Sequence, residues 1–331
     1  MHWFDDDLGD TTPEAALEIH EEVAREILSE NDSPDLAFRY SVNPYRGCTH
    51  GCAYCYARPT HSWLGYGAGT DFDTKIVVKT NAPELLDRAL RSKRWKGDPL
   101  VFSGVTDCYQ PIERRYRITR RCLEVCAAHR CPVSIITKSP LVLRDIDVLR
   151  TLPAVRVFMS IPFLDDGPGR ALEPFVAAPT LRFRALRELA AAGIDTGISI
   201  APLIPGLNEH ELPGLIGAAA SAGVQRASLT LLRLPREARE VFEERLRSAC
   251  PGQDARVRRG IEEFRQGQKD GVRFGERMVG TGTRWDLVVQ VFEKLCKRHD
   301  LHAVRIGDDF DPTEILPPAR ARGVQRQLFE D

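Results

Sequence analysis

Between residues 100 and 232 of this 331-residue chain, short apolar segments alternate with longer amphipathic ones. Short strands that alternate with helices of ten or more residues indicate βαβ units and a parallel sheet. The sequence therefore predicts an α/β fold. The predicted strands cover residues 38–45, 100–102, 133–137, 155–161, 196–201 and 226–232, and the predicted helices between them cover residues 116–129, 141–150, 180–192 and 209–222.

Further elements are expected on both sides of this alternation. An acidic, disordered tip at residues 1–11 is followed by a predicted helix at 12–29, because Ile19, Val23 and Ile27 recur at helical spacing. The tail from residue 317 is expected to be disordered. The remaining predictions are strands at 75–79 and 301–306, and helices at 83–95, 237–249, 255–266 and 284–299.

Charge and cysteine content narrow the classes of function. The net charge of −1 gives no global basic field for nucleic acid, so any such contact would be local. The acidic N-terminus does not resemble a secretory signal, and no apolar run is long enough to span a bilayer. Nine cysteines, an odd number, indicate reduced thiols and a cytoplasmic location.

Three of these cysteines, Cys48, Cys52 and Cys55, have the spacing Cys-x3-Cys-x2-Cys. Three thiolates leave a cubane iron–sulfur cluster one ligand short, and an open iron is a place for chemistry. Zinc is an alternative, with His50 or His61 as a fourth ligand. Chance crowding of reduced thiols is a third interpretation.

The sequence around these cysteines resembles the cluster motif of radical S-adenosylmethionine (radical SAM) enzymes. Residues 43–48 (NPYRGC) and 54–58 (YCYAR) are similar to the branch related to the spore photoproduct lyases. The resemblance implies a [4Fe–4S] cluster on the three cysteines, S-adenosylmethionine on the open iron, and Tyr54 against the adenine. It also implies an electron donor such as a flavodoxin or ferredoxin.

Six predicted strands are too few for an eight-stranded barrel, but they suit the partial (β/α)6 TIM-type barrel that the resemblance implies. The expected organisation is an N-terminal tail and helix (1–36), the radical SAM core barrel (37–235), and a C-terminal helical extension with a disordered tail (236–331).

In parallel α/β proteins the reactive groups gather at the carboxyl ends of the strands. Residues 103–113 follow one predicted strand and resemble the S/G-x-x-T-D-x-Y-Q-P-x-E stretch of the branch. The resemblance implies that Ser103, Thr106 and Asp107 receive the methionine amino group. Asp107 would also fit an Asx-type turn that caps the next helix.

Three more candidates follow later strands. Lys138 can pair with the carboxylate of the cofactor, although a solvated lysine is the alternative. Ser160 is a candidate partner for the methionyl or ribose group. Pro202 lies in a segment that resembles the family's apolar backing for the adenine, with a loop and an Asn208 helix cap as the alternative.

Two other groups of residues, one of cysteines and one of arginines, are expected to have structural roles. Cys122, Cys126 and Cys131 could form a second metal site, but buried cysteines behave as small hydrophobes, and we expect a core role. The arginines between residues 114 and 121 could bind phosphates, but the net charge favours a solvated helix face.

The predicted function is that of a radical SAM enzyme that acts on an unidentified substrate, with nucleic acid among the candidates. Repair of the spore photoproduct in DNA is the alternative. The repair enzymes carry a hydrogen-donating cysteine in the loop after the second barrel strand, and Cys108 is the cysteine near that position, on the other side of Asp107. A non-catalytic iron–sulfur or zinc interaction protein is the second alternative.

Overall fold

The computed structural model describes residues 16–33, 36, 38–164, 167–265 and 278–305. Its main sheet has eight strands in the order β11-β10-β9-β8-β7-β6-β3-β2. Neighbouring strands are parallel, except that β2 pairs antiparallel with β3. The strands are β2 (Leu28–Glu30), β3 (Tyr40–Val42), β6 (Leu100–Phe102), β7 (Val133–Thr137), β8 (Val155–Ser160), β9 (Asp195–Leu203), β10 (Arg226–Leu231) and β11 (His302–Val304).

The predicted α/β fold is confirmed. The six strands predicted before and within the alternation are β3, β6, β7, β8, β9 and β10, and they lie side by side in chain order. The strand predicted at residues 301–306 is β11, which extends the sheet beyond β10. Among the described residues β11 and β2 remain unpaired on their outer sides, so the (β/α)6 barrel is open.

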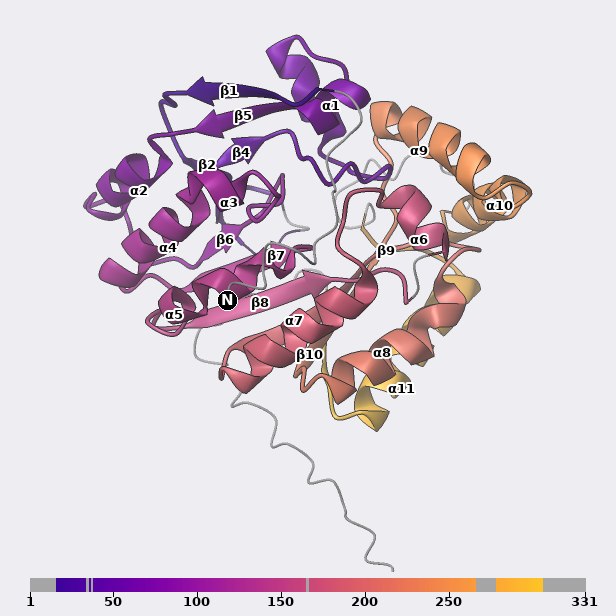
Figure 1. The fold of residues 1–331 in the computed structure, drawn as a ribbon. Coiled ribbons are helices and arrows are strands. Elements are labelled where there is room, and N and C mark those ends of the chain that lie inside the picture. Colours follow the sequence, from indigo (N-terminus) through magenta and orange to yellow (C-terminus); the bar gives the residue numbers. More distant parts are fainter. Residues whose placement is uncertain (1–15, 34–35, 37, 165–166, 266–277, 306–331) are drawn as a thin grey trace, which may run out of the picture.

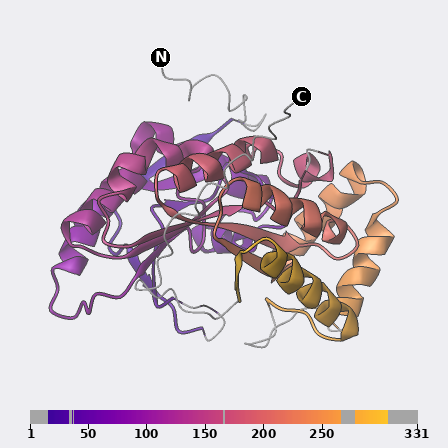
Figure 2. The same ribbon diagram turned by 90° about the horizontal axis from the view of Figure 1, so that it is seen from below.

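Helices between the strands cover one face of this sheet (Figures 1 and 2). Ile135 of β7 and Val157 and Met159 of β8 are fully buried in the main core on that side. Ile136 points the other way and is 38% exposed in a central strand, so the opposite face is open there. These helices are α2 (Ala82–Leu90), α3 (Glu113–Tyr116), α4 (Ile118–Ala128), α5 (Ile146–Leu149), α6 (Gly167–Leu172), α7 (Pro179–Ala191) and α8 (Leu212–Ser221), with 3-10 turns η2 (Pro140–Asp145) and η3 (Glu209–Glu211).

The helix predicted at residues 12–29 is wrong. Described residues of that segment form β1 (Glu18–Glu22) and β2, and β1 belongs to a small sheet of order β1-β5-β4. Val23, assigned to the apolar face of the helix, is 79% exposed, whereas Ile27 is buried. Parallel pairing with β5 (Lys75–Lys79), a strand that was predicted, overrides the helical spacing. The third strand is β4 (Tyr45–Arg46), and η1 (Arg58–Leu64) and α1 (Thr70–Thr74) precede β5.

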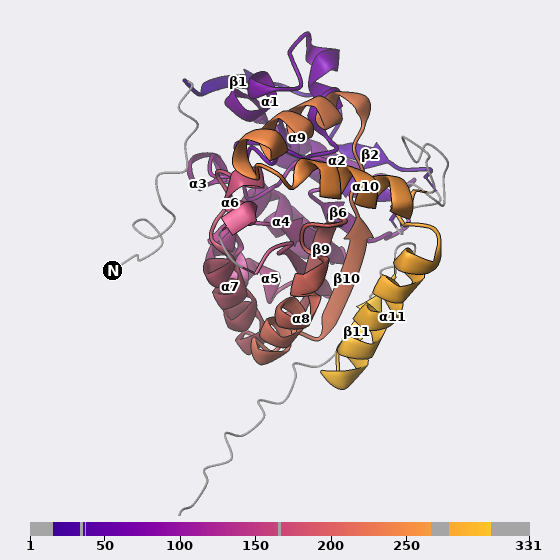
Figure 3. The ribbon, with the colours of Figure 1, turned by 90° about the vertical axis from the view of Figure 1, so that its right-hand side faces the viewer.

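After β10 the chain forms α9 (Arg236–Ala249), α10 (Asp254–Phe264) and α11 (Thr283–Arg298), which match the three predicted helices. Helices α9 and α10 lie beyond the carboxyl ends of β9 and β10 (Figure 3), where α9 contacts α6 and η1. The tip at residues 1–11 and the tail from residue 317 lie outside the described residues. In the part that the structure describes, no helix combines the length and apolar character needed to cross a membrane.

Candidate functional site

The cysteine loop leaves β4 and turns at two glycines. Gly47 and Gly51 have φ values of 77° and 64°, in the left-handed region that glycine adopts most easily. A Cβ atom at Gly47 would also lie only 2.8 Å from the carbonyl oxygen of Lys75 on β5. The close approach of two strands therefore fixes the path of the loop just before Cys48.

The three thiols of this loop are inside the protein. Cys48 and Cys52 are buried, Cys55 is partly exposed, and none forms a disulfide. Burial raises the pKa of all three thiols, and negative charge on Asp107, Cys52 and Cys55 raises the pKa of Cys48 further. A metal centre at this position would deprotonate these thiols on coordination.

Three closely spaced thiols are a donor set of the kind that iron–sulfur clusters take. Across the described ranges, no group of three or more His, Cys, Asp or Glu side chains is arranged to hold a single metal ion. The ligands of a cubane cluster are spread over several irons and need not converge on one point. Nδ1 of His50 lies 3.4 Å from the carboxylate of Asp107, and Nε2 of His61 lies 2.9 Å from the carbonyl oxygen of Lys75.

Gln110 is a residue of the motif at 103–113 that was not named as a site candidate, and its side chain bonds the backbone on both sides of Cys48. Its Oε1 accepts a hydrogen bond from the amide of Thr49 (3.0 Å), and its Nε2 donates to the carbonyl oxygen of Gly47 (3.1 Å). The side chain is fully buried, so both bonds are shielded from water. It therefore ties the loop after β6 to the backbone on both sides of the first cysteine.

Asp107 joins the same loop to the end of β7. Its Oδ1 accepts hydrogen bonds from the amide of Tyr109 (2.8 Å) and the hydroxyl of Thr137 (2.8 Å), and its Oδ2 accepts one from the amide of Lys138 (2.7 Å). His50 faces the same Oδ2. Burial alone would raise the pKa of Asp107, but the charge of His50 and these hydrogen bonds hold it below its usual value. A carboxylate has about four acceptor positions, so protein groups engage all of them.

The other candidates in this loop are also held by the fold. The hydroxyl of Ser103 accepts a hydrogen bond from the amide of Cys108 (2.8 Å), and the hydroxyl of Thr106 donates to the carbonyl oxygen of Tyr45 (2.9 Å). Cys108 is fully buried in the main core, where burial and the charge of Asp107 raise the pKa of its thiol. The structure places this thiol in the core beside the helices.

Lys138 and Ser160 lie together with Tyr54 around a buried carboxylate. Nζ of Lys138 is 2.6 Å from Oγ of Ser160 and 2.9 Å from Oε1 of Glu173. Glu173 also accepts a hydrogen bond from the hydroxyl of Tyr54 and pairs with Arg182 (2.8 Å). Burial alone would raise the pKa of Glu173, but the charges of Arg182 and Lys138 and the Tyr54 hydrogen bond hold it at about 2.

The sequence named three outer members of this network, Tyr54, Lys138 and Ser160, as site candidates. Glu173 at its centre resembles an acidic position of the branch, but the sequence assigned it no role. Glu173 follows α6, in the connection that leads away from β8, and is 2% exposed. The signal that could have identified it is its place after a barrel strand, where functional groups gather. Its link to Tyr54 spans 119 positions of sequence, which no local pattern reveals.

Pro202 is the eighth residue of β9 and does not join this network among the described contacts. Its carbonyl oxygen accepts a hydrogen bond from Nδ2 of Asn208 (3.1 Å), which also donates to the carbonyl oxygen of Pro162 (2.7 Å). The side chain of Asn208 therefore bridges two loops, and the side-chain helix cap expected there is absent.

The structure places the second cysteine group in the core and pairs two arginines of the 114–121 segment. Cys122, Cys126 and Cys131 are buried in the main core between helices and sheet. In the arginine-rich segment, Arg120 pairs with Asp145, Asp147 and Glu124, and Arg121 pairs with Glu84. These carboxylates neutralise charge that a phosphate would otherwise meet.

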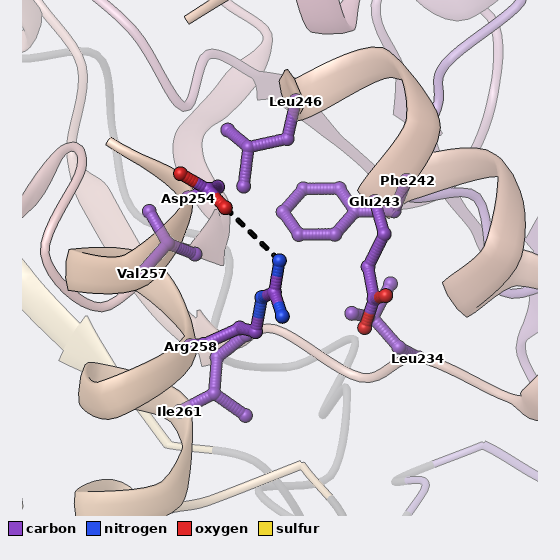
Figure 4. A pocket seen from close by; sticks show the side chains of 8 residues that line it. All are labelled: Leu234, Phe242, Glu243, Leu246, Asp254, Val257, Arg258 and Ile261. Atoms are coloured by element: carbon purple, nitrogen blue, oxygen red, sulfur yellow. Dashed lines mark hydrogen bonds and ion pairs between the residues drawn. The ribbon is translucent and has the colours of Figure 1, made fainter. Parts of the chain in front are cut away.

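A small pocket lies between α9 and α10, and its apolar lining belongs to the same hydrophobic cluster as Cys52 and Tyr54 (Figure 4). Its lining is mostly apolar, and Arg258 in it pairs with Asp254 at 2.9 Å. A binding site usually combines apolar walls with several convergent polar groups, and this pocket lacks such a set. The candidate site is therefore the region around the cysteine loop, Lys138 and Glu173.

Comparison with known proteins adds independent evidence. A sequence model described as the radical SAM superfamily matches residues 42–219. An uncharacterized protein of Mycobacterium tuberculosis is 35% identical over 258 residues, which are 76% of this chain and 75% of that protein. A protein of Pseudomonas phage M6, named radical SAM Nalpha-GlyT isomerase, is 30% identical over 171 residues, 51% of this chain and 34% of that protein.

A solved structure supports the fold. A mutant of spore photoproduct lyase with bound AdoMet and dinucleoside spore photoproduct matches with a TM-score of 0.66 and 17% identity. The match covers 88% of this chain and 82% of that chain. At this identity the likeness concerns the fold, and it includes the open parallel barrel described above.

Proposed function

Because this chain belongs to the radical SAM superfamily and is an enzyme of that class, we propose that Cys48, Cys52 and Cys55 hold a [4Fe–4S] cluster and that the adjacent polar network binds S-adenosylmethionine. When bound, these groups supply reductive cleavage of the sulfonium and a 5′-deoxyadenosyl radical that takes hydrogen from a substrate. The chain itself supplies binding, orientation and exclusion of water. A flavodoxin or ferredoxin is the proposed electron donor.

The observation that carries this proposal is the network in which Lys138 contacts both Ser160 and Glu173 and Tyr54 bonds Glu173. Tyr54 belongs to the cysteine loop, in which Cys48 and Cys52 are buried and Cys55 is partly exposed. Lys138 offers an ammonium group to the cofactor's carboxylate, and Ser160 offers a hydroxyl to its methionyl or ribose part. Tyr54 is adjacent in sequence to Cys55, so its ring is suited to line the adenine. Pro202 is proposed to back the adenine from β9.

The loop after β6 has a divided role in this proposal. Ser103 and Thr106 are proposed to receive the methionine amino group. Protein donors already surround the carboxylate of Asp107, which we therefore assign to orienting the end of β7 and the cysteine loop.

Cofactor cleavage tests this function directly. Protein reconstituted without oxygen is expected to hold about four irons per chain and, with dithionite and S-adenosylmethionine, to release 5′-deoxyadenosine. Cys52→Ala should lose both properties, whereas Cys122→Ala, a change at a buried core cysteine, should keep the iron. A colourless protein loaded with zinc would overturn the proposal. Iron without 5′-deoxyadenosine would leave the non-catalytic alternative.

Repair of a DNA photoproduct is the second candidate. It is favoured by the fold shared with a lyase structure that contains a dinucleoside photoproduct. Two observations weigh against it: the thiol of Cys108 is buried in the core, and the arginines Arg120 and Arg121 are ion-paired. Turnover of a dinucleotide spore photoproduct by the reconstituted enzyme would establish repair, and failure to turn it over would exclude it.

A further inference from the structure

Arg58 begins η1, three residues after the last cysteine of the loop, and its side chain is fully buried. Its Nε and Nη2 atoms both donate to the carbonyl oxygen of Cys52, at 3.0 and 2.9 Å. Nη1 donates to the carbonyl oxygens of Ala68 (2.9 Å) and Gly69 (3.0 Å), and Nη2 also bonds Asp73 (2.9 Å). The guanidinium therefore fixes the second cysteine against the segment that leads to β5.

Burying the Arg58 guanidinium costs free energy, because the charge loses its hydration. A neutral donor could bond the same carbonyl oxygens without that cost. Asp73 offsets part of that cost, yet its own carboxyl is unfavourable there, since burial raises the pKa of Asp73 to about 6 despite the charge of Arg58. A further negative charge next to Arg58 would offset the remaining cost of burying its guanidinium.

The cysteine loop can supply that negative charge, because iron–sulfur clusters are held by thiolates. Arg58 is three residues from Cys55, and its guanidinium bonds the backbone of Cys52 directly. A buried guanidinium that bonds the backbone of one ligand can act on both the geometry and the charge of a cluster.

We propose that Arg58 is a positioning residue for the cluster, which holds the Cys52 backbone in place and whose buried positive charge raises the cluster's reduction potential. The inference rests on the proposed function, because it takes the three cysteines as cluster ligands. Reduction adds negative charge to the cluster, so a neighbouring cation stabilises the reduced form more than the oxidised form. Asp73 has the opposite effect on the potential and keeps it from rising further.

Four variants of the full-length reconstituted enzyme separate charge from positioning. Arg58→Gln removes the charge and is expected to make the midpoint potential, followed by EPR during a redox titration, more negative. Asp73→Asn removes the opposing charge and is expected to make it less negative. Arg58→Lys keeps the charge but loses the fork that bonds Cys52 twice, so its potential should stay near that of the parent enzyme. Its iron should pass to a chelator about 10- to 100-fold faster.

Arg226→Gln is the matched control. Arg226 is equally buried and pairs with Asp195, but it lies at the amino end of β10, away from the cysteines. Its loss should reduce the free energy of unfolding and leave the potential and the iron release unchanged.

If Arg58→Gln does not retain a cluster, Arg58→Lys and Asp73→Asn still test the proposed role of Arg58. An unshifted potential in Asp73→Asn together with parental iron release in Arg58→Lys would overturn the inference. An unmodified enzyme that binds no cluster would instead refute the proposed function.

Discussion

The ammonium group of Lys138 lies 2.9 Å from the carboxylate of Glu173, and this ion pair connects the end of β7 to the segment after α6. The pair is mostly buried, with side-chain exposures of 14% and 2%. Because Glu173 is also paired with Arg182, its charge stays compensated if Lys138 turns towards an anionic ligand. Lys138 could therefore turn to a carboxylate ligand without leaving Glu173 unpaired.

Replacing Lys138 by Ala is expected to weaken binding of S-adenosylmethionine. A hydrogen bond to a charged group contributes about 1.5–3 kcal/mol, so the dissociation constant should rise about tenfold or more. Equilibrium dialysis of the cofactor against cluster-loaded enzyme measures this change. Lys93→Ala, at an exposed position, should bind like the parent enzyme. Equal affinity in both variants would remove Lys138 from the binding site.

Gln110→Ala is expected to make the cluster more labile. Without the amide, the backbone on both sides of Cys48 loses two buried hydrogen bonds, and loss of a supporting partner weakens metal binding about 10- to 100-fold. The rate of iron transfer to a chelator provides the measurement. Gln225→Ala is the matched control, because Gln225 is a buried glutamine that bonds the backbone of Thr196 far from the cysteines. Equal rates in both variants would show that Gln110 has no special relation to Cys48.

Acid should remove stability that Glu173 provides. The pKa of its carboxyl is held at about 2 in the folded protein, below its usual value of 4.5. Its contribution is therefore complete above pH 4.5 and is lost as the pH falls towards 2, with a size of roughly 3 kcal/mol. Urea unfolding of the parent protein and Glu173→Gln at pH 6, 4 and 3 should show the difference in unfolding free energy shrinking as the pH falls. A difference that is constant with pH would contradict the assignment.

Two glycine substitutions should have opposite effects on stability. A Cβ atom at Gly197 of β9 would overlap the ring of Phe158 on β8, so Gly197→Ala should cost about 1–3 kcal/mol. Gly217 lies within α8 and its nearest neighbour would be 4.0 Å away, so Gly217→Ala should stabilise by up to about 1 kcal/mol. Thermal unfolding of the two variants checks both signs, and destabilisation by both would mean that the helix does not tolerate the methyl group.

The main sheet was predictable because its strands are short segments rich in buried apolar residues that alternate with amphipathic helical segments. Buried parallel strands such as Val133–Thr137 show this pattern regardless of their partners. The N-terminal segment was not predictable in the same way. Ile19, Val23 and Ile27 have helical spacing, and only the presence of β5 as a partner selects the extended form.

The site was predictable in its composition and not in its connections. Cys48, Lys138 and Asp107 follow strands that a sequence can locate, so they could be named as candidates. The pairing of Lys138 with Glu173 and the complete engagement of Asp107 depend on loops that meet only after folding. Sequence patterns describe neighbours along the chain, and these contacts join segments 30 or more positions apart.

The hydrogen bond between Tyr54 and Glu173 also bears on how the protein is made. Tyr54, which stands among the cysteines, leaves the ribosome 119 residues before Glu173, the carboxylate that it bonds. At about 5–20 residues per second, synthesis of the residues between them takes roughly 6–24 s. During this time the thiols are exposed to solvent, because the segment that encloses them has not yet been made. Cluster delivery during that interval would meet an unfinished pocket, so insertion fits a later stage, after residues up to Arg182 have been synthesised and folded.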